Sequence, residues 1–293
     1  MNVRRAIFIT AVLFLMAISA IAQDAPQEAP PPQFSFEQLD NLVARIALYP
    51  DSLLSQVLAA STFSDQIPDA ARWADQHHYL NGQDLANAMQ QDQLPWDPSV
   101  QALLPFPSVL DMMASDINWT SNLGNAFLSQ QQDVMDAVQR ERQKAQNYGY
   151  LRSNAQVVVS GGPYITIVPV RPAYVAVPVY DPAVVFFAPA PGFVVGGAVR
   201  FGFFVGVGPF FGPWGWGYSR FDWGAHAVFI NNARWQRSWV NRRAYVHSYP
   251  AVRRYEPAGR TVEHHELRPR SENERSAARE GRARVEEHHH ERR

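Results

Sequence analysis

The sequence of 293 residues contains no cysteine, and only one of its 26 basic residues, Lys144, is a lysine. Without a thiol the chain has no disulfide, no thiolate nucleophile, no cysteine-ligated zinc and no iron–sulfur cluster. Charged residues make up 18% of the chain and hydrophobic residues 46%. This composition excludes a wholly disordered chain and a disulfide-stapled mini-protein, and it allows one or two domains with a real core.

Catalytic signatures are also missing. The chain has no Gly-x-Ser-x-Gly, no His-Glu-x-x-His, no phosphate-binding loop and no dinucleotide fingerprint. Two carboxylates of the N-terminal half could form a glycosidase-type pair, although helix capping explains Asp51 and Asp97 better. The candidates are Asp51, Asp65, Asp69, Asp97, Asp111 and Asp116. The sequence leaves enzymatic activity open, selects no catalytic residue, cofactor or metal ligand, and favours a role without catalysis.

The N-terminus has the three parts of a secretory signal peptide. Arg4 and Arg5 precede an apolar run over residues 6–18, which is too short to span a bilayer comfortably. Ala20-Ile21-Ala22 then fits the rule for a cleavage site. We expect a signal peptide over 1–22, cleaved after Ala22, and export to the periplasm or cell envelope. An uncleaved N-terminal anchor is the alternative.

Charge is divided unevenly along the chain. Residues 23–151 contain 5 basic and 16 acidic residues, whereas residues 152–250 contain 8 arginines and 2 aspartates. An acidic front and a basic back predict separate regions with separate surfaces. Because arginine binds planar anions bidentately, the back suits phosphate or carboxylate partners. Codon usage in a GC-rich genome explains the preference for arginine equally well.

Residues 35–150 have helical periodicity and follow a proline-rich linker over 23–34. Tyr49-Pro50, Trp96-Asp97-Pro98 and Phe106-Pro107 each read as a helix start, with an aromatic residue that packs back on the first turn. The last helix is expected to run from Asn118 or Thr120 to about Asn147, with its end as a solvated, coiled-coil-like extension. The sequence therefore predicts an N-terminal all-helical domain.

Four stretches of this region carry a resemblance to a known family. The stretches are Ala47–Ala60 (ALYPDSLLSQVLAA), Ala70–Trp73 (AARW), Leu94–Val100 (LPWDPSV) and Gln132–Gln139 (QDVMDAVQ). They resemble the domain of unknown function 3300 family, whose members are uncharacterised exported bacterial proteins. The resemblance implies a signal peptide, an aspartate-rich helical front and a back rich in glycine and tryptophan. It implies no activity, cofactor or catalytic residue.

Residues 155–190 change to a period of two. Strands are expected over 156–159, 164–170 and 174–180, with turns at 160–163 and 171–172. Pro169 and Pro178 have no N–H group to donate to a neighbouring strand, so they predict edge positions or polyproline-like segments. The overall prediction is an α+β fold, with a small antiparallel β segment after the helical domain.

Residues 191–250 combine glycine, aromatic residues and arginine. The uncharged run 201–218 is compatible with insertion at a membrane, with a pad packed on the chain's own sheet, or with an exposed patch that docks a partner. Over residues 219–250, arginine and aromatic residues are interleaved. This pattern fits ordinary strands with a solvated arginine face, and it also fits a contact surface. The expected contact residues are Trp214, Trp216, Trp223, Arg234, Trp235, Arg237, Trp239, Arg242 and Arg243. An anionic envelope surface or an envelope protein suits them better than nucleic acid does.

Residues 251–293 mix arginine, glutamate and histidine with almost no large apolar residue. Such a segment cannot bury enough apolar surface to order itself, so a disordered tail is expected. Its histidines could bind zinc or nickel weakly, or serve only as polar residues. Taken together, the sequence favours an uncharacterised, exported envelope protein with a structural or interaction role. A hydrolase of envelope polymers and an assembly or chaperone-like factor are the alternatives.

Overall fold

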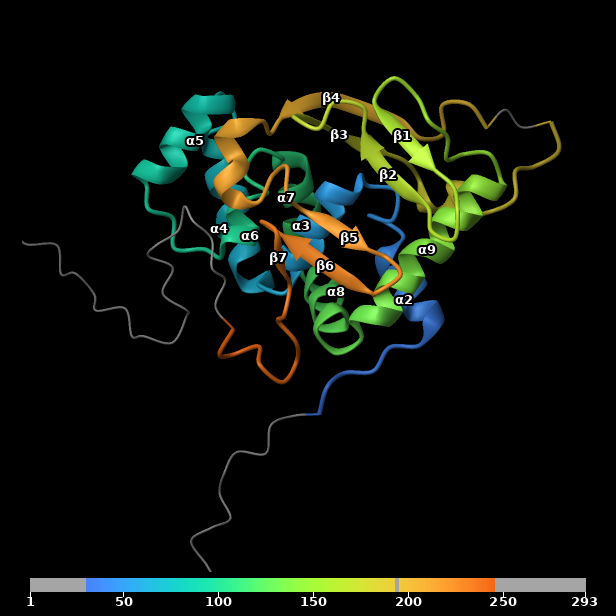
Figure 1. Cartoon of the computed structure of the whole chain (residues 1–293), viewed down its shortest axis with the longest axis horizontal. Coiled ribbons are helices and arrows are strands. Elements are labelled where there is room, and N and C mark those ends of the chain that lie inside the picture. Colours follow the sequence, from blue (N-terminus) through green and yellow to red (C-terminus); the bar gives the residue numbers. More distant parts are fainter. Residues whose placement is uncertain (1–29, 193–194, 246–293) are drawn as a thin grey trace, which may run out of the picture. The chain divides into compact units, whose positions relative to one another are not determined.

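The computed structural model describes residues 30–192 and 195–245 (Figure 1). The expected signal peptide over 1–22, most of the linker over 23–34 and the expected tail over 251–293 lie outside the described residues. Within the described ranges the chain is an α+β protein, with helices in its first half and small antiparallel sheets in its second half. This confirms the fold class predicted from the sequence.

Most helices of the first half begin where the sequence supplies a side-chain cap or a proline; those that begin after Asn81 and Gln130 have neither. Ser35 and Gln38 form a reciprocal capping box, and Asp97 accepts the amide proton of Ser99. Such side chains satisfy amide groups that have no partner inside the helix. The helices are α2 (Phe36–Val43), α3 (Asp51–Ser61), α4 (Ile67–Gln76), α5 (Gly82–Gln91), α6 (Pro98–Gln101), α7 (Pro107–Ser115), α8 (Ile117–Ser129) and α9 (Gln131–Asn147), with the short 3-10 helix η1 (Ser64–Gln66).

The single long helix expected up to Asn147 is wrong, because α8 and α9 are separate. Asp116, rather than Asn118 or Thr120, caps α8. Gln130 interrupts the helical hydrogen bonding, because its backbone has an extended φ of −138°. Its side-chain amide accepts the N–H of Phe34 and donates to the carbonyl of Phe34. The expected solvated end of the last helix is also wrong. Arg142 is completely buried, because α9 packs against α2 and the guanidinium lies among the carbonyls of Ala47, Tyr49 and Ile165.

Three small antiparallel sheets make up the second half. They consist of β1 (Val157–Ser160) with β2 (Thr166–Pro169), β3 (Tyr174–Val179) with β4 (Arg200–Gly206), and β5 (Arg220–Asp222), β6 (Ala227–Ile230) and β7 (Ala233–Arg234). The expected positions of the prolines are confirmed: Pro169 ends β2, and Pro178 borders an irregularity in the pairing of β3 with β4. Helix α10 (Pro182–Val185) and 3-10 helix η2 (Pro209–Trp214) lie between the strands.

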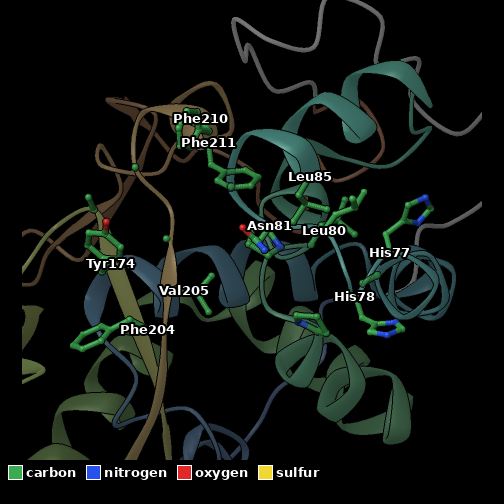
Figure 2. A pocket seen from close by; sticks show the side chains of 18 of the residues that line it. His77, His78, Leu80, Asn81, Leu85, Tyr174, Phe204, Val205, Phe210 and Phe211 are labelled. Carbon is green, nitrogen blue, oxygen red and sulfur yellow. The ribbon is translucent and has the colours of Figure 1, made fainter.

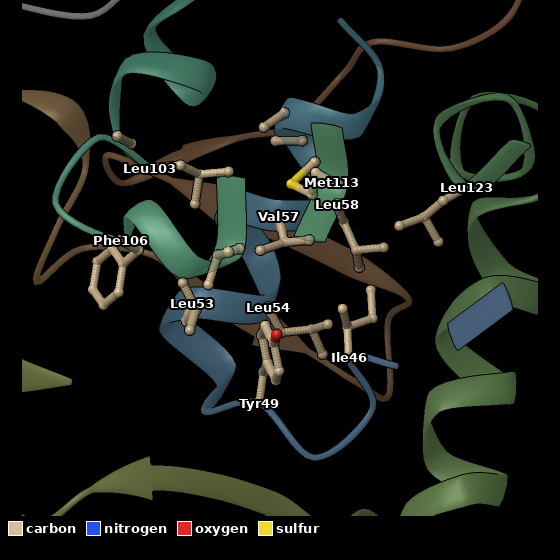
Figure 3. Close-up of a cluster of buried hydrophobic side chains, with 14 of the residues drawn as sticks. Ile46, Tyr49, Leu53, Leu54, Val57, Leu58, Leu103, Phe106, Met113 and Leu123 are labelled. Carbon is tan, nitrogen blue, oxygen red and sulfur yellow. The ribbon is translucent and has the colours of Figure 1, made fainter. Parts of the chain in front are cut away.

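Helix α3 is the centre of one hydrophobic core. Every residue from Leu53 to Ser61 is buried, and Figure 3 shows Leu54, Val57 and Leu58 among side chains of other helices. Helix α8 approaches α3 so closely that a Cβ added to Gly124 would lie 2.1 Å from the backbone oxygen of Ser61. The three-stranded sheet β5–β6–β7 covers α3 from another side (Figure 1).

The same core continues into the second half of the chain. Its buried members include Val175, Phe211, Trp214, Val228 and Trp235 as well as the helical residues. The acidic front and the basic back, which the sequence separates by charge, are therefore joined by shared apolar packing. Burial at about 25 cal/mol per Å² makes such packing the main stabilising contribution.

Candidate functional site: an aromatic cleft beside the β3–β4 hairpin

The glycine–aromatic stretch packs on the helices. Trp214 donates its indole N–H to Gln101 Oε1 at 2.9 Å, and Trp216 donates to the carbonyl of Ala102 at 2.8 Å. Both indoles are buried, and Trp216 also contacts the ring of Phe106. Of the three alternatives for residues 201–218, the structure agrees best with a pad that packs on the chain itself. The pad covers helices, however, and not the sheet that was expected.

Trp223 belongs to a buried polar network that connects the two halves. Its indole N–H is 3.3 Å from Asp51 Oδ2, and its ring lies 5.0 Å from the guanidinium carbon of Arg142. Arg142 donates to Asp51 and to the carbonyls of Ala47, Tyr49 and Ile165. This satisfies a guanidinium that would be costly to bury without partners. The network is a structural element.

Three further expected contact residues are held by packing near Thr62 and Leu128. Trp235 is buried between Phe127 and Tyr245. Arg237 stacks on Phe63, 3.6 Å from the ring centroid, and donates to Thr62. The backbone amide of Trp239 bonds the carbonyl of Leu128.

The remaining three expected contact residues are arginines. Arg242 stacks on the ring of Trp239, whereas Arg234 and Arg243 are exposed. The structure thus places Trp214, Trp216, Trp223 and Trp235 in the interior, where they pack the chain on itself. Only part of the expected contact set faces outward.

A cleft of about 620 Å³ opens beside these elements (Figure 2). One wall is the β3–β4 hairpin with Tyr174, Phe204 and Val205, of which Val205 points toward the opposite wall, the turn into α5 with Leu80 and Leu85. Phe210 and Phe211 of η2 close one end. We call this site the aromatic cleft. Its other lining residues are Ala74, His77, His78, Asn81, Gly82, Leu104, Pro105, Pro107, Ala173, Gly206, Gly208 and Pro209.

Two glycines lie beside aromatic rings of the cleft. Gly206 is paired with Tyr174 across the hairpin, and a Cβ at Gly206 would make ordinary van der Waals contact with the ring of Tyr174, 3.7 Å away. Gly82, with φ +50°, lies under the ring of Phe210. Tyr174 and Phe204 meet edge to face, with their centroids 6.4 Å apart. The three rings remain 41–46% exposed, so they offer apolar surface to a ligand.

Polar chemistry in the aromatic cleft is sparse. None of the 19 lining residues is aspartate, glutamate, lysine or arginine. His77 stacks on Trp73 and bonds its carbonyl through Nδ1, while His78 bonds the carbonyl of Asp75. Both imidazoles are held by α4 and point away from the hairpin (Figure 2). This arrangement suits binding of an uncharged group better than proton transfer.

Sequence reasoning missed the aromatic cleft, because its walls come from segments separated by about a hundred positions. The signal that was present is the alternation of exposed aromatic residues with glycine in β4 and η2. That alternation identifies candidate aromatic residues, but it does not indicate which of their side chains are exposed.

Two of the six candidate aspartates, Asp97 and Asp116, are helix caps, so the capping role expected of Asp97 is confirmed. The capping role expected of Asp51 is wrong, because Pro50 is the N-cap and Asp51 accepts bonds from Arg142 and Trp223 instead. Asp51 and Asp69 lie in first helical turns. Asp97 is completely buried, and its Oδ2 has no hydrogen-bond partner. Burial therefore raises the pKa of Asp97 to about 6. These positions explain the aspartates without a catalytic pair.

A second cleft, of about 630 Å³, is lined by two carboxylates, Asp40 and Glu141, that share one lysine. Lys144 Nζ lies 2.6 Å from Glu141 Oε1 and 3.4 Å from Asp40 Oδ2. Burial raises the pKa of Glu141, although the bond from Lys144 opposes the shift. The Glu141 side chain is only 4% exposed. Within the described ranges, no group of three or more histidine, aspartate or glutamate residues could hold a metal ion.

Comparison with known proteins places this α+β architecture in a family. A family model described as "Protein of unknown function (DUF3300)" matches residues 35–264, so the chain belongs to that family. The resemblance seen in the sequence is thereby confirmed.

The chain is also similar to "Uncharacterized protein YacH" of Escherichia coli (strain K12), with 39% identity over 186 residues. The match covers 52% of this chain and 30% of that relative, so this chain spans less than a third of its length. No solved structure matches the chain.

Proposed function

We propose that this protein is a non-catalytic binding protein of the bacterial cell envelope, and that the aromatic cleft holds an uncharged, apolar segment of a partner. The signal-peptide pattern of residues 1–22 supports the location. The chemistry of the cleft supports the type of ligand. The same cleft would also accept an apolar segment of a partner that is not yet folded. The assembly-factor alternative therefore differs from the proposed binding protein only in the identity of the partner.

The observation that carries this proposal is the absence of charged side chains other than histidine from the cleft lining. An ionised ligand group would lose hydration there without a compensating ion pair, which is costly. Apolar groups instead gain contact with Tyr174, Phe204 and Phe210, which are half-exposed. The cleft volume lies in the range of ordinary ligand sites.

A neutral fluorescent probe, N-phenyl-1-naphthylamine, tests the site directly. Titrating the probe into the chain from Gln23 onward is expected to give saturable binding to one site. Phe204→Ala and Phe210→Ala are each expected to weaken binding by about fivefold to tenfold, because each removes one aromatic wall contact of about 1 kcal/mol.

The matched control is Phe203→Ala. Phe203 is the neighbour of Phe204 on β4 and is 98% exposed, but it does not line the cleft. Probe binding by this variant should equal that of the unchanged chain. Binding that does not saturate, or an equal loss in the Phe203 and Phe204 variants, would refute the assignment of the cleft.

The envelope location is tested separately by fractionation of cells and sequencing of the mature N-terminus. We expect the chain in the periplasmic or envelope fraction, beginning at Gln23. Recovery of only the intact precursor, in the cytosolic fraction, contradicts the location. That result leaves the probe experiment unaffected.

A second candidate function, an envelope-polymer hydrolase, has one observation in its favour. The cleft beside α2 and α9 contains Asp40 and Glu141, and the pKa of Glu141 is raised, as a general acid requires. Lys144 pairs with both carboxylates, however, and Glu141 is nearly enclosed. Release of reducing ends from purified wall polymer, abolished by Glu141→Gln, would establish this function in place of the first.

A further inference from the structure

The outer face of the three-stranded sheet carries two arginines on either side of a phenylalanine. Arg220 of β5 is the cross-strand partner of Phe229 on β6, and Phe229 is the partner of Arg234 on β7. Direct partners on antiparallel strands project from the same face. We call these three residues the arginine ladder.

Burial shows which face of the sheet is free. Val228 and Ile230, which alternate with Phe229 along β6, are buried against the core. Arg220 and Arg234 are exposed. Because successive side chains of a strand point to opposite faces, the ladder faces away from α3. The two arginines stand two strand spacings apart, or about 10 Å.

The guanidinium groups of the ladder have few internal partners. The guanidinium carbon of Arg220 lies 4.3 Å from the ring centroid of Phe229, and its one side-chain hydrogen bond, to Asn232, is long at 3.5 Å. Within residues 30–192 and 195–245, no carboxylate lies within 4.0 Å of either guanidinium. The nearby acid on β5, Asp222, bonds the amide of Ala225 instead.

Stacking on Phe229 leaves the N–H edge of a guanidinium directed outward. A planar guanidinium in this position donates well to phosphate oxygens. Tyr218 adds an amphipathic ring at the end of the ladder, since its carbonyl accepts the amide proton of Asn232 and its side chain is 52% exposed. Tyrosine with arginine is typical of surfaces that contact lipid headgroups.

We infer that the arginine ladder is a contact surface for an anionic membrane and binds the phosphate groups of lipid headgroups. A flat, exposed face with two separated cations fits a surface that presents many phosphates better than it fits one enclosed phosphate. Among the described residues, no helix has both the length and the hydropathy of a membrane span. This inference concerns a different face from the aromatic cleft and does not depend on it.

Vesicle co-sedimentation tests the inference. The chain from Gln23 onward, which retains every described residue, is mixed with vesicles of equal parts phosphatidylglycerol and phosphatidylcholine, or of phosphatidylcholine alone. We expect binding to the anionic vesicles only, and weaker binding as salt is raised. Each arginine near such a surface contributes about fivefold in affinity, so Arg220→Gln with Arg234→Gln should reduce partitioning by roughly 25-fold.

The matched control replaces two other exposed arginines, Arg171→Gln with Arg200→Gln, and removes the same formal charge. These residues border the β3–β4 hairpin, and we expect at most a twofold loss. An equal loss in both double variants, or no preference for anionic vesicles, overturns the inference. Release by inorganic phosphate at constant ionic strength also overturns it, because it identifies a site for one free phosphate.

Discussion

The indole N–H of Trp214 donates to Oε1 of Gln101 at 2.9 Å, and both side chains are buried although 113 positions separate them in the sequence. The amide of Gln101 is fixed in this orientation, because its Nε2 donates to the carbonyls of Leu94 and Trp96. Together with the bond from Trp216 to the carbonyl of Ala102, this bond attaches the glycine–aromatic stretch to helix α6 and its C-cap.

Trp214→Phe removes the donor and leaves a buried oxygen without a partner. The free energy of unfolding is expected to fall by about 2 kcal/mol, since an unsatisfied buried acceptor costs its full desolvation. Urea denaturation followed by circular dichroism measures the change. Tyr218→Phe, at an exposed ring, should change stability by less than about 0.5 kcal/mol. Equal stability of the Trp214 variant and the unchanged chain would show that the bond contributes nothing.

Arg142→Met is expected to lower the free energy of unfolding by about 3–5 kcal/mol. The substitution leaves Asp51 and three carbonyls without the cation that they surround. Arg140→Met is the matched change on the same helix, and its half-exposed pair with Asp40 should be worth about 1 kcal/mol or less. Similar losses in the two variants, measured by chemical denaturation, contradict the assigned role of Arg142.

Asp97 gives the protein a defined dependence of stability on pH. Its pKa is raised from 3.8 to about 6 in the folded chain, so the folded state binds the proton more tightly than the unfolded state does. The free energy of unfolding therefore decreases as the pH rises from about 3 to 7, by roughly 3 kcal/mol from this group.

The test is denaturation of the unchanged chain and of Asp97→Asn at several pH values. Asparagine preserves a capping acceptor but does not ionise. The difference in unfolding free energy between the two proteins should change by about 3 kcal/mol between pH 3 and pH 7, in favour of the variant at high pH. A difference that is independent of pH would mean that Asp97 titrates normally.

Gly124→Ala is expected to destabilise the protein by about 3 kcal/mol, the upper end of the cost of overpacking. The added Cβ meets the backbone of Ser61 and Thr62, and neither can move as a flexible side chain would. At Gly212, where an added Cβ meets nothing within 4 Å, the same substitution should be nearly neutral. Thermal unfolding of both variants compares the crowded position at the crossing of α3 and α8 with the open position in η2, and equal melting temperatures would exclude close packing at Gly124.

The local signals in the sequence predicted local structure well. Proline and aspartate at 97–98 mark the start of a helix in the structure, because capping and proline sterics act within one turn. The interruption between α8 and α9 at Gln130 was harder to predict from the sequence. It depends on hydrogen bonds to Phe34, almost a hundred positions away, and no window of neighbouring residues contains that partner.

The sequence also could not predict which aromatic side chains are buried and which are exposed. Trp214 and Phe210 stand four positions apart in the same 3-10 helix, yet one is buried and the other lines the aromatic cleft. Their identities are equally apolar, so composition ranks them together. The direction each ring takes depends on how η2 lies against α5 and α6.

Neighbouring residues were enough to predict the α+β class, the helix starts at Pro50, Asp97 and Phe106, and the family, since each of these depends on residues close to one another along the chain. Tertiary structure alone decided that the tryptophans lie inside and that Arg142 is buried, and it alone formed the aromatic cleft and the arginine ladder. Those features depend on contacts between residues far apart in the chain, and burial and hydrogen bonding at such contacts set their energies.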